Sequence, residues 1–255
     1  MKDYLILAYH RILPEKLASA RGSLTVNTVQ FDKQISYLVR KGWRSLTLSE
    51  FYHKFILQGL EPKKVFVITF DDGYQDNYLY AFPILKKYNV KATIFLVANM
   101  LETSKNLYFT DVQIPYEISD VDRSLRQEQI KEMQKYGIEF GSHTLTHARL
   151  DSMELDSVKH EIRLSKINLE SYLNTKVNTF CYPYGALNDK VIELVKESGY
   201  QCAVVTPPRS GIIETAFTLY RSGIYLSDSF IKFKLKCTDL FYTLRRTNLW
   251  FSLKK

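Results

Sequence analysis

The chain has 255 residues, of which 45% are hydrophobic and 24% are charged. This apolar content excludes an intrinsically disordered chain, and three cysteines without a CxxC spacing exclude a small disulfide-stapled module and predict free thiols in a reducing compartment. The formal net charge of +8 is compatible with a nucleic-acid partner, an anionic membrane surface or a soluble basic protein.

Residues 1–10 form a poor secretory signal sequence. Their apolar run is short, Asp3 adds an acid, and His10 and Arg11 interrupt the run. No stretch of the sequence approaches the roughly 20 apolar residues of a membrane-spanning helix. We therefore expect a cytoplasmic protein, or one that is peripheral to the inner membrane.

Strand-like and helix-like segments alternate along the first 228 residues. Short apolar runs predict buried strands at 5–9, 65–70, 92–97, 138–141, 179–182 and 202–205. Apolar stripes at helical spacing predict helices at 31–39, 80–88, 127–136, 155–172 and 189–198. The polar and aromatic segment 101–126 is predicted to form a long loop. Repeated βα units imply an α/β fold in which a parallel sheet is either open or closed into a barrel, as one domain over residues 1–228.

Two adjacent carboxylates, Asp71 and Asp72, follow the predicted strand at 65–70. The carboxyl ends of strands are where active sites assemble in βα folds, and two buried acids are costly unless a cation or a proton compensates them. The structural alternative is capping of a helix that begins near Tyr74, because aspartate is a favoured cap. One cap, however, explains one aspartate and not both.

His143 and His147 follow the predicted strand at 138–141 and are four residues apart. On one face of a helical turn such a pair can hold one metal ion, and two ordinary surface or core histidines are the alternative. With Asp72 the pair forms a set of two histidines and one carboxylate, which is typical of a catalytic metal site with a position left for water. Zinc is the first choice, and the ligands also suit other divalent transition metals.

A third segment, YPYG at 182–185, follows the predicted strand at 179–182. Such a turn exposes backbone N–H groups that can bind an oxyanion, although taken alone a plain strand-to-helix turn explains it better. Cys181, just before this turn, is expected to pack as a small buried apolar residue and not to act as a nucleophile.

TFDDG at 69–73, HTLTH at 143–147 and YPYG at 182–185, in this order, resemble the motifs of the polysaccharide deacetylase (NodB-homology) family, carbohydrate esterase family 4. The resemblance covers roughly residues 5–226. It implies a distorted (β/α) barrel and metal-dependent removal of N-acetyl groups from amino sugars.

The resemblance also implies roles for individual residues. By position, Asp71 resembles the catalytic base of the family, and Tyr184 resembles the residue whose backbone N–H helps to hold the oxyanion. By position, three residues resemble the family's metal ligands: Asp72, His143 and His147. In this mechanism Asp71 takes the proton of a metal-activated water that attacks the amide.

The sequence departs from the common family pattern in two places. Many members have an arginine three residues before the proline of the third motif, where Phe180 stands here. Many also have a late Leu-x-His whose histidine is the general acid, whereas no histidine follows His160 in this chain.

Two residues are candidates for the missing roles. YHRI at 9–12 and YRSGI at 220–224 resemble a branch that includes partial deacetylases of poly-N-acetylglucosamine, in which these elements are circularly permuted. His10 ends the first predicted strand and is the candidate acid, with a satisfied strand-end histidine as the alternative. Arg221 is the candidate cation that holds Asp71.

Most of the positive charge belongs to a basic C-terminal tail, residues 229–255. The tail has seven lysines and arginines against one aspartate, so it carries +6 of the +8 and the first 228 residues carry +2. This distribution argues against a DNA-binding face on the domain. Leucines, phenylalanines and Trp250 beside the basic residues suggest either a final element packed on the barrel or an amphipathic anchor for peripheral contact with an anionic membrane.

These observations lead to a main hypothesis and two rivals. The main hypothesis is a metal-dependent hydrolase that removes N-acetyl groups from the amino sugars of a surface polysaccharide or its precursor. The first rival is a catalytically impaired carbohydrate-binding relative, suggested by Phe180 and by the absent late histidine. Retention of Asp71 argues against it, because a pure binding protein needs no base. The second rival, a nucleic-acid-binding protein, is supported by charge alone, and we expect no nucleic-acid partner.

Overall fold

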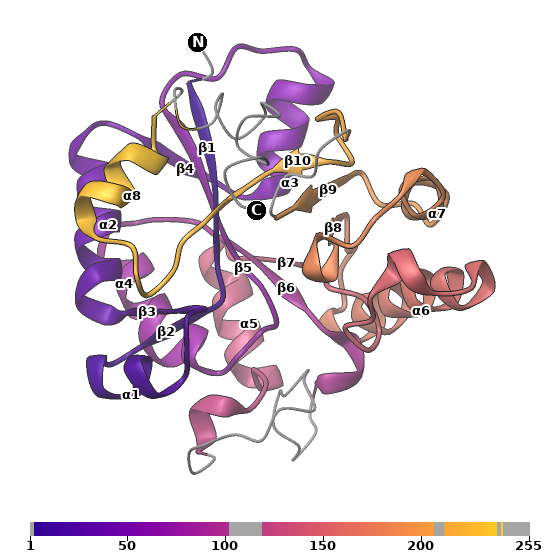
Figure 1. Ribbon diagram of the computed structural model, residues 1–255, viewed down its shortest axis with the longest axis horizontal. Coiled ribbons are helices and arrows are strands. Elements are labelled where there is room, and N and C mark those ends of the chain that lie inside the picture. The colour runs from indigo at the N-terminus through magenta and orange to yellow at the C-terminus, as the bar shows by residue number, and fades with distance from the viewer. Residues whose placement is uncertain (1–2, 102–118, 207–211, 239–240, 242–255) are drawn as a thin grey trace, which may run out of the picture.

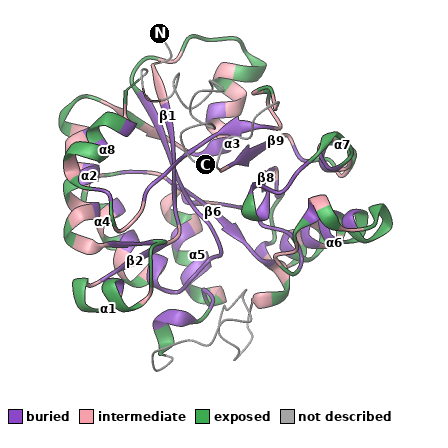
Figure 2. Cartoon of the chain, viewed as in Figure 1, coloured by how far each residue is buried: buried purple, intermediate pink, exposed green. Residues whose placement is uncertain are grey.

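The computed structural model of the protein describes residues 3–101, 119–206, 212–238 and 241. Parallel strands form its centre and helices surround them (Figure 1). Buried residues concentrate on the strands, while the outward faces of the helices are exposed (Figure 2). Within these residues, no helix combines the length and the apolar character that crossing a bilayer requires.

The central sheet is nearly closed into a barrel. Its strands run in the order β10-β9-β8-β7-β6-β5-β1-β11, β4 also pairs with β5, and each strand pair is parallel. The strands are β1 (Tyr4–Tyr9), β4 (Arg44–Leu46), β5 (Val65–Phe70), β6 (Thr93–Leu96), β7 (Glu139–Ser142), β8 (Thr179–Cys181), β9 (Cys202–Val205), β10 (Leu219–Tyr220) and β11 (Ser222–Gly223). The predicted fold class, a distorted (β/α) barrel, is confirmed.

One short segment closes the ring. β10 pairs with β9 and β11 pairs with β1, and Arg221 is the single residue between them. The Arg221 backbone N–H donates to the Val205 carbonyl at 3.2 Å, and the Ile224 N–H donates to the Ala8 carbonyl at 2.9 Å. Residues 219–224 therefore join the two ends of the sheet.

Helices cover the outside of the barrel. They are α1 (Glu15–Ala20), α2 (Thr28–Arg40), α3 (Leu48–Phe51), α4 (Phe82–Lys87), α5 (Gln127–Tyr136), α6 (Leu155–Leu173), α7 (Asp189–Glu197) and α8 (Phe230–Lys236), with π-helical turns at Tyr52–Leu57 and Asn77–Ala81. The five predicted helices correspond to α2, α4, α5, α6 and α7, and the six predicted strands to β1, β5, β6, β7, β8 and β9. The sequence reading missed the short elements, which include the separate pair β2 (Arg11–Leu13) and β3 (Thr25–Asn27).

Alternation along the strands divides the core in two. Ile6, Val67 and Phe95 belong to an inner cluster inside the barrel, with Leu48 and Phe51 of α3. Their sequence neighbours belong to an outer cluster that packs against the helices. Successive side chains of a strand point to opposite faces, so this pattern also fixes which residues beyond each strand end face inwards.

The basic tail begins with a helix that packs on the barrel beside α2 (Figure 1). Phe233 of α8 is fully buried, and the buried Lys236 Nζ donates to the Gly223 carbonyl and pairs with Asp228. Apolar and basic residues alternate in IKFKLK at 231–236, yet this stretch forms a helix, and α8 shares the core of the barrel. The later residues suggested for an amphipathic helix lie outside the described residues apart from Phe241, as do residues 102–118 of the predicted long loop.

Candidate metal centre and active site

The inward-facing positions converge at one end of the barrel. Continuing the alternation of the inner cluster past each strand end gives His10 after β1, Asp71 after β5, His143 after β7, Thr206 after β9 and Arg221 between β10 and β11. This is the carboxyl end of the parallel strands, where the sequence placed the chemistry. The site is therefore built at the ends of the central strands.

Asp71 and Arg221 form a bidentate ion pair. Arg221 Nη1 donates to Asp71 Oδ1 at 2.6 Å and Arg221 Nη2 donates to Asp71 Oδ2 at 2.7 Å, and both residues are buried. Arg221 is itself fixed, because it donates to the hydroxyls of Thr69 at 2.9 Å and Thr206 at 2.8 Å. Burial raises the pKa of Asp71, but the guanidinium more than offsets this and holds the pKa well below its usual range. Asp71 is thus a carboxylate at neutral pH.

His10 lies on the open side of the same carboxylate. Its Nε2 is 3.8 Å from Asp71 Oδ2, and its side chain is 21% exposed. Burial lowers the pKa of His10, while the Asp71 charge opposes the shift. The backbone is held as well, since the Asn77 side-chain amide donates to the His10 carbonyl at 2.9 Å. The sequence therefore indicated the correct place for His10, and its role as an acid stays a prediction.

Asp72, His143 and His147 meet beside this pair. His143 Nε2 is 3.6 Å and His147 Nε2 is 3.4 Å from Asp72 Oδ1, and one ligand atom from each residue lies within 4.8 Å of the others. Burial lowers the pKa of His143 to about 4, so its ring is neutral at pH 7. Burial and the Asp71 charge raise the pKa of Asp72, a cost that a bound cation would offset.

The free atoms of this group fit a divalent metal ion. Asp72 Oδ1 is buried and accepts no hydrogen bond within the described residues. The other nitrogen of each ring is engaged elsewhere: His143 Nδ1 lies 2.8 Å from the Cys181 carbonyl, and His147 Nδ1 lies 3.0 Å from the Tyr184 hydroxyl. A carbonyl can only accept, so His143 carries its proton on Nδ1 and presents the Nε2 lone pair to the group. Two imidazoles and one carboxylate suit zinc and several other divalent metals.

The two histidines are not on a helix, so that part of the prediction was wrong. Residues 143–147 form a loop after β7 in which Thr144 and His147 have left-handed backbones, with φ of 67° and 65°. The buried Glu161 carboxylate of α6 holds the loop by accepting from the backbone N–H groups of Leu145 and Thr146, both at 3.0 Å. A carboxylate from outside the motif thus replaces the intrahelical bonds that the spacing suggested.

Neither aspartate caps a helix, contrary to the structural alternative. Asp72 and Gly73 both have left-handed backbones, with φ of 76° and 73°, so the chain turns sharply after β5. A non-glycine residue in this region is strained, and such strain concentrates at functional sites. The following helical turn begins only at Asn77, and its cap residue Asp76 makes no capping bond.

Tyr184 lies at the edge of the site on the turn Pro183–Gly185. The residue is 45% exposed, and its ring packs edge-on against His147, with ring centroids 4.7 Å apart. The sequence singled out its backbone N–H as an oxyanion donor, which stays a prediction. It gave no sign that the side-chain hydroxyl reaches a candidate metal ligand.

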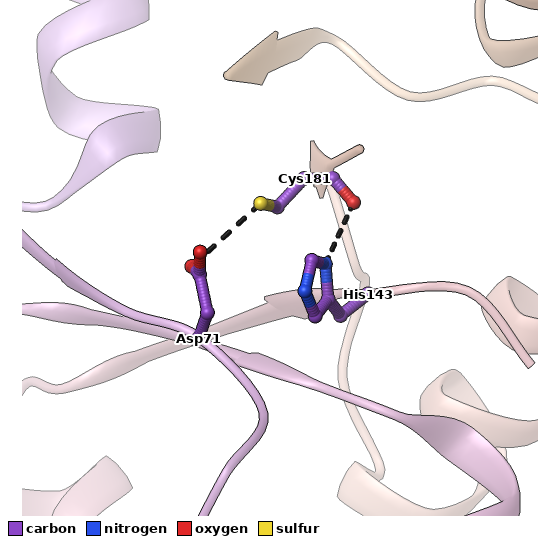
Figure 3. A group of neighbouring side chains, drawn as sticks. All are labelled: Asp71, His143 and Cys181. Carbon is purple, nitrogen blue, oxygen red and sulfur yellow. Dashed lines mark hydrogen bonds between the residues drawn. The ribbon is translucent and has the colours of Figure 1, made fainter. Parts of the chain in front are cut away.

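Asp71, His143 and Cys181 also gather closely enough to resemble a metal site (Figure 3). Both oxygens of Asp71 already bind the Arg221 guanidinium, and a second cation there would meet its charge. Burial raises the pKa of the Cys181 thiol well above its usual range, so the sulfur keeps its proton. The thiol donates to Asp71 at 3.6 Å and accepts from Arg221 at 3.1 Å. Cys181 is therefore a buried residue that hydrogen-bonds to Asp71 and Arg221 and is not a metal ligand.

Comparisons with known proteins identify relatives over most of the chain. A family model described as polysaccharide deacetylase matches residues 58–203. The Bacillus subtilis protein YxkH, named as a polysaccharide deacetylase, is 32% identical over 204 residues, which are 80% of this chain and 64% of that protein. A poly-β-1,6-N-acetyl-D-glucosamine N-deacetylase of Staphylococcus epidermidis is 32% identical over 77% of this chain and 70% of its own length.

Solved structures show the same fold. The Streptococcus pyogenes deacetylase PplD, in complex with acetate, has a TM-score of 0.77 and 29% identity, covering 92% of this chain and 98% of that one. IcaB from Ammonifex degensii has a TM-score of 0.74 over 92% of this chain and 96% of its own. At 23% identity, this second match supports the fold alone.

Proposed function

The chain belongs to the polysaccharide deacetylase family, and we propose that it is a metal-dependent hydrolase that removes N-acetyl groups from amino sugars of the N-acetylglucosamine type. The observation that carries the proposal is the convergence of a buried, unpartnered carboxylate oxygen, Asp72 Oδ1, with the Nε2 atoms of His143 and His147 beside an arginine-held carboxylate. The relatives named for poly-β-1,6-N-acetyl-D-glucosamine support a polysaccharide substrate, either at the cell surface or as its precursor.

Asp72, His143 and His147 would hold the metal, and zinc is the proposed ion. A divalent metal there would lower the pKa of water and polarise the amide carbonyl. Asp71 is the base. Its place beside the metal ligands and its ionised state, secured by Arg221, allow it to receive the proton of the attacking water.

His10 is the proposed acid for the departing amine. Because burial lowers its pKa, the ring is neutral before the reaction and must gain a proton during it. Asp71, 3.8 Å away, is the nearest proton source once it has acted as base. The proton can therefore pass from Asp71 to His10 and then to the nitrogen of the breaking amide. The Tyr184 backbone N–H is the proposed donor to the oxyanion.

Acetate release tests the proposal. Metal-free protein is loaded with zinc or another divalent metal and incubated with a panel of N-acetylated glycans that includes poly-β-1,6-N-acetylglucosamine. We expect acetate release that chelator abolishes and that Asp71→Asn reduces by about 10²- to 10⁴-fold. If the loaded protein binds a glycan but releases no acetate, the chain is a carbohydrate-binding relative and the enzyme proposal fails.

We also propose peripheral membrane contact through the basic tail. On α8, Ile231 and Leu235 are 68% and 56% exposed, with the exposed Lys232 and Lys234 between them. Apolar side chains flanked by lysines suit an anionic bilayer surface. Flotation with anionic liposomes should be lost in an Ile231→Ser, Leu235→Ser variant that keeps the buried Phe233 and Lys236, and equal flotation of both proteins would exclude the contact through α8.

A further inference from the structure

One segment, residues 181–184, contacts the Nδ1 atoms of both candidate metal histidines, on the side of each ring opposite Nε2. The carbonyl at the end of β8, on Cys181, meets His143 Nδ1 at 2.8 Å, and the Tyr184 hydroxyl on the following turn meets His147 Nδ1 at 3.0 Å. The two rings themselves are in edge contact, with centroids 4.8 Å apart. A four-residue stretch therefore controls the orientation of two ligands that come from a different loop.

The chemistry of the ring fixes the direction of the second hydrogen bond. A neutral imidazole that presents the Nε2 lone pair carries its proton on Nδ1. The Tyr184 oxygen must then accept from His147 Nδ1, just as the Cys181 carbonyl accepts from His143. Outer partners of this kind set the tautomer and the orientation of metal-binding histidines.

We propose that the Tyr184 hydroxyl is a positioning group, which holds His147 in the tautomer and orientation that bind the metal. This inference rests on the metal site of the proposed function. It gives the side chain of Tyr184 a role that is separate from the role of its backbone N–H.

The turn is built to present this hydroxyl. Tyr184 has a left-handed backbone with φ of 58°, after a proline and before Gly185. A Cβ on Gly185 would lie 2.8 Å from the Thr206 carbonyl oxygen, so the turn sits against β9 and has no room to move inwards. The tyrosine ring is thereby set beside His147.

If the hydroxyl had a purely structural role, its removal would change the stability of the metal-free protein and not the metal affinity alone. Tyr184 is 45% exposed, so removing its hydroxyl leaves no cavity in the core. Tyr184→Phe keeps the ring contact with His147 and deletes only the hydrogen bond. A change in metal binding by this variant, without a change in thermal stability of the metal-free protein, isolates the hydroxyl.

Tyr182→Phe is the matched control. Tyr182 stands two residues earlier, and its hydroxyl donates to the Phe217 carbonyl at 3.0 Å, outside the metal group. The Tyr182→Phe variant also loses one tyrosine hydroxyl from this segment, but that hydroxyl does not contact a candidate metal ligand.

The experiment measures the zinc dissociation constant of metal-free protein by competition with a chromophoric chelator. We expect Tyr184→Phe to weaken zinc binding by about 10- to 100-fold, Tyr182→Phe to leave it unchanged, and Asp72→Ala to abolish it. The visible spectrum of the cobalt-loaded protein should change in Tyr184→Phe and not in the control. If Asp72→Ala removes zinc binding but Tyr184→Phe binds zinc as the wild type does, the positioning role is wrong and the metal site stands. If Asp72→Ala binds zinc normally, the metal site fails, and the positioning role fails with it.

Discussion

Replacing Arg221 by methionine should destabilise the protein mainly through the carboxylate that it leaves behind. Asp71 is buried, and both of its carboxylate oxygens accept hydrogen bonds from this guanidinium. Without it, Asp71 must either remain charged in a dry environment or take up a proton. Methionine fills similar space, so the lost charge and hydrogen bonds dominate over any cavity.

The size of the effect follows from the contacts. Removing one partner of a buried ion pair costs about 3–5 kcal/mol of unfolding free energy, because the remaining charge is uncompensated. The pKa of Asp71 should rise above the unfolded value of about 3.9 in the variant, since Arg221, the main group that opposes the effect of burial, is then absent. An acid whose folded pKa is raised loses stability as pH rises through the unfolded pKa. The deficit should therefore be larger at pH 7 than at pH 4.

Urea unfolding of metal-free proteins at both pH values provides the assay. The decisive comparison is with the double variant Arg221→Met, Asp71→Asn, which removes the stranded charge and should recover a large part of the loss. Any one of three results would refute the role of the stranded charge: a single-variant loss below about 1 kcal/mol, a deficit equal at pH 4 and pH 7, or a double variant no more stable than the single one.

Three other substitutions test separate parts of the site. His10→Gln should lower kcat by about 10²-fold or more with unchanged zinc content, and a wild-type kcat would remove His10 from the mechanism. Glu161→Ala should lower the unfolding free energy in urea by about 1–3 kcal/mol, since it leaves two backbone N–H groups of the histidine loop without an acceptor. It should also weaken zinc binding. A wild-type unfolding free energy together with a wild-type zinc affinity would show that Glu161 does not hold the loop. Gly141→Ala should cost about 1–3 kcal/mol by overpacking, because its Cβ would lie 2.5 Å from Thr179 Oγ1 and 2.6 Å from the Phe95 ring. A neutral effect in thermal unfolding would show that both side chains can move aside.

The long periodic elements could be predicted from the sequence because burial dictates their pattern. The apolar runs of β1 and β5 and the stripe of α2 are examples, each marked by side chains that face one core. β10 and β11, with two residues each, are too short to carry a period. Periodicity alone therefore leaves the sheet open or closed, and the barrel is predicted only by the family resemblance.

The candidate site could be predicted in composition but only partly in geometry. Strand ends identify Asp71, Asp72 and His143 as neighbours, because parallel strands bring their carboxyl ends together. The contribution of Glu161 arises from a helix whose acidic residues look alike in sequence, and only the fold shows which one turns inwards. The same holds for the Tyr184 hydroxyl, whose direction depends on a left-handed backbone that tyrosine seldom adopts.

The segment that closes the barrel has a consequence for how the protein is made. Leu7 pairs with Ser222, so nearly the whole chain must be synthesised before the ring can shut, and contacts of such high sequence separation form slowly. Arg221 arrives in that same step. A chain that ends before residue 219 lacks both the closing strands and the counter-ion of Asp71. Closure of the barrel and fixation of the proposed base are therefore one event, because both depend on residues 219–224.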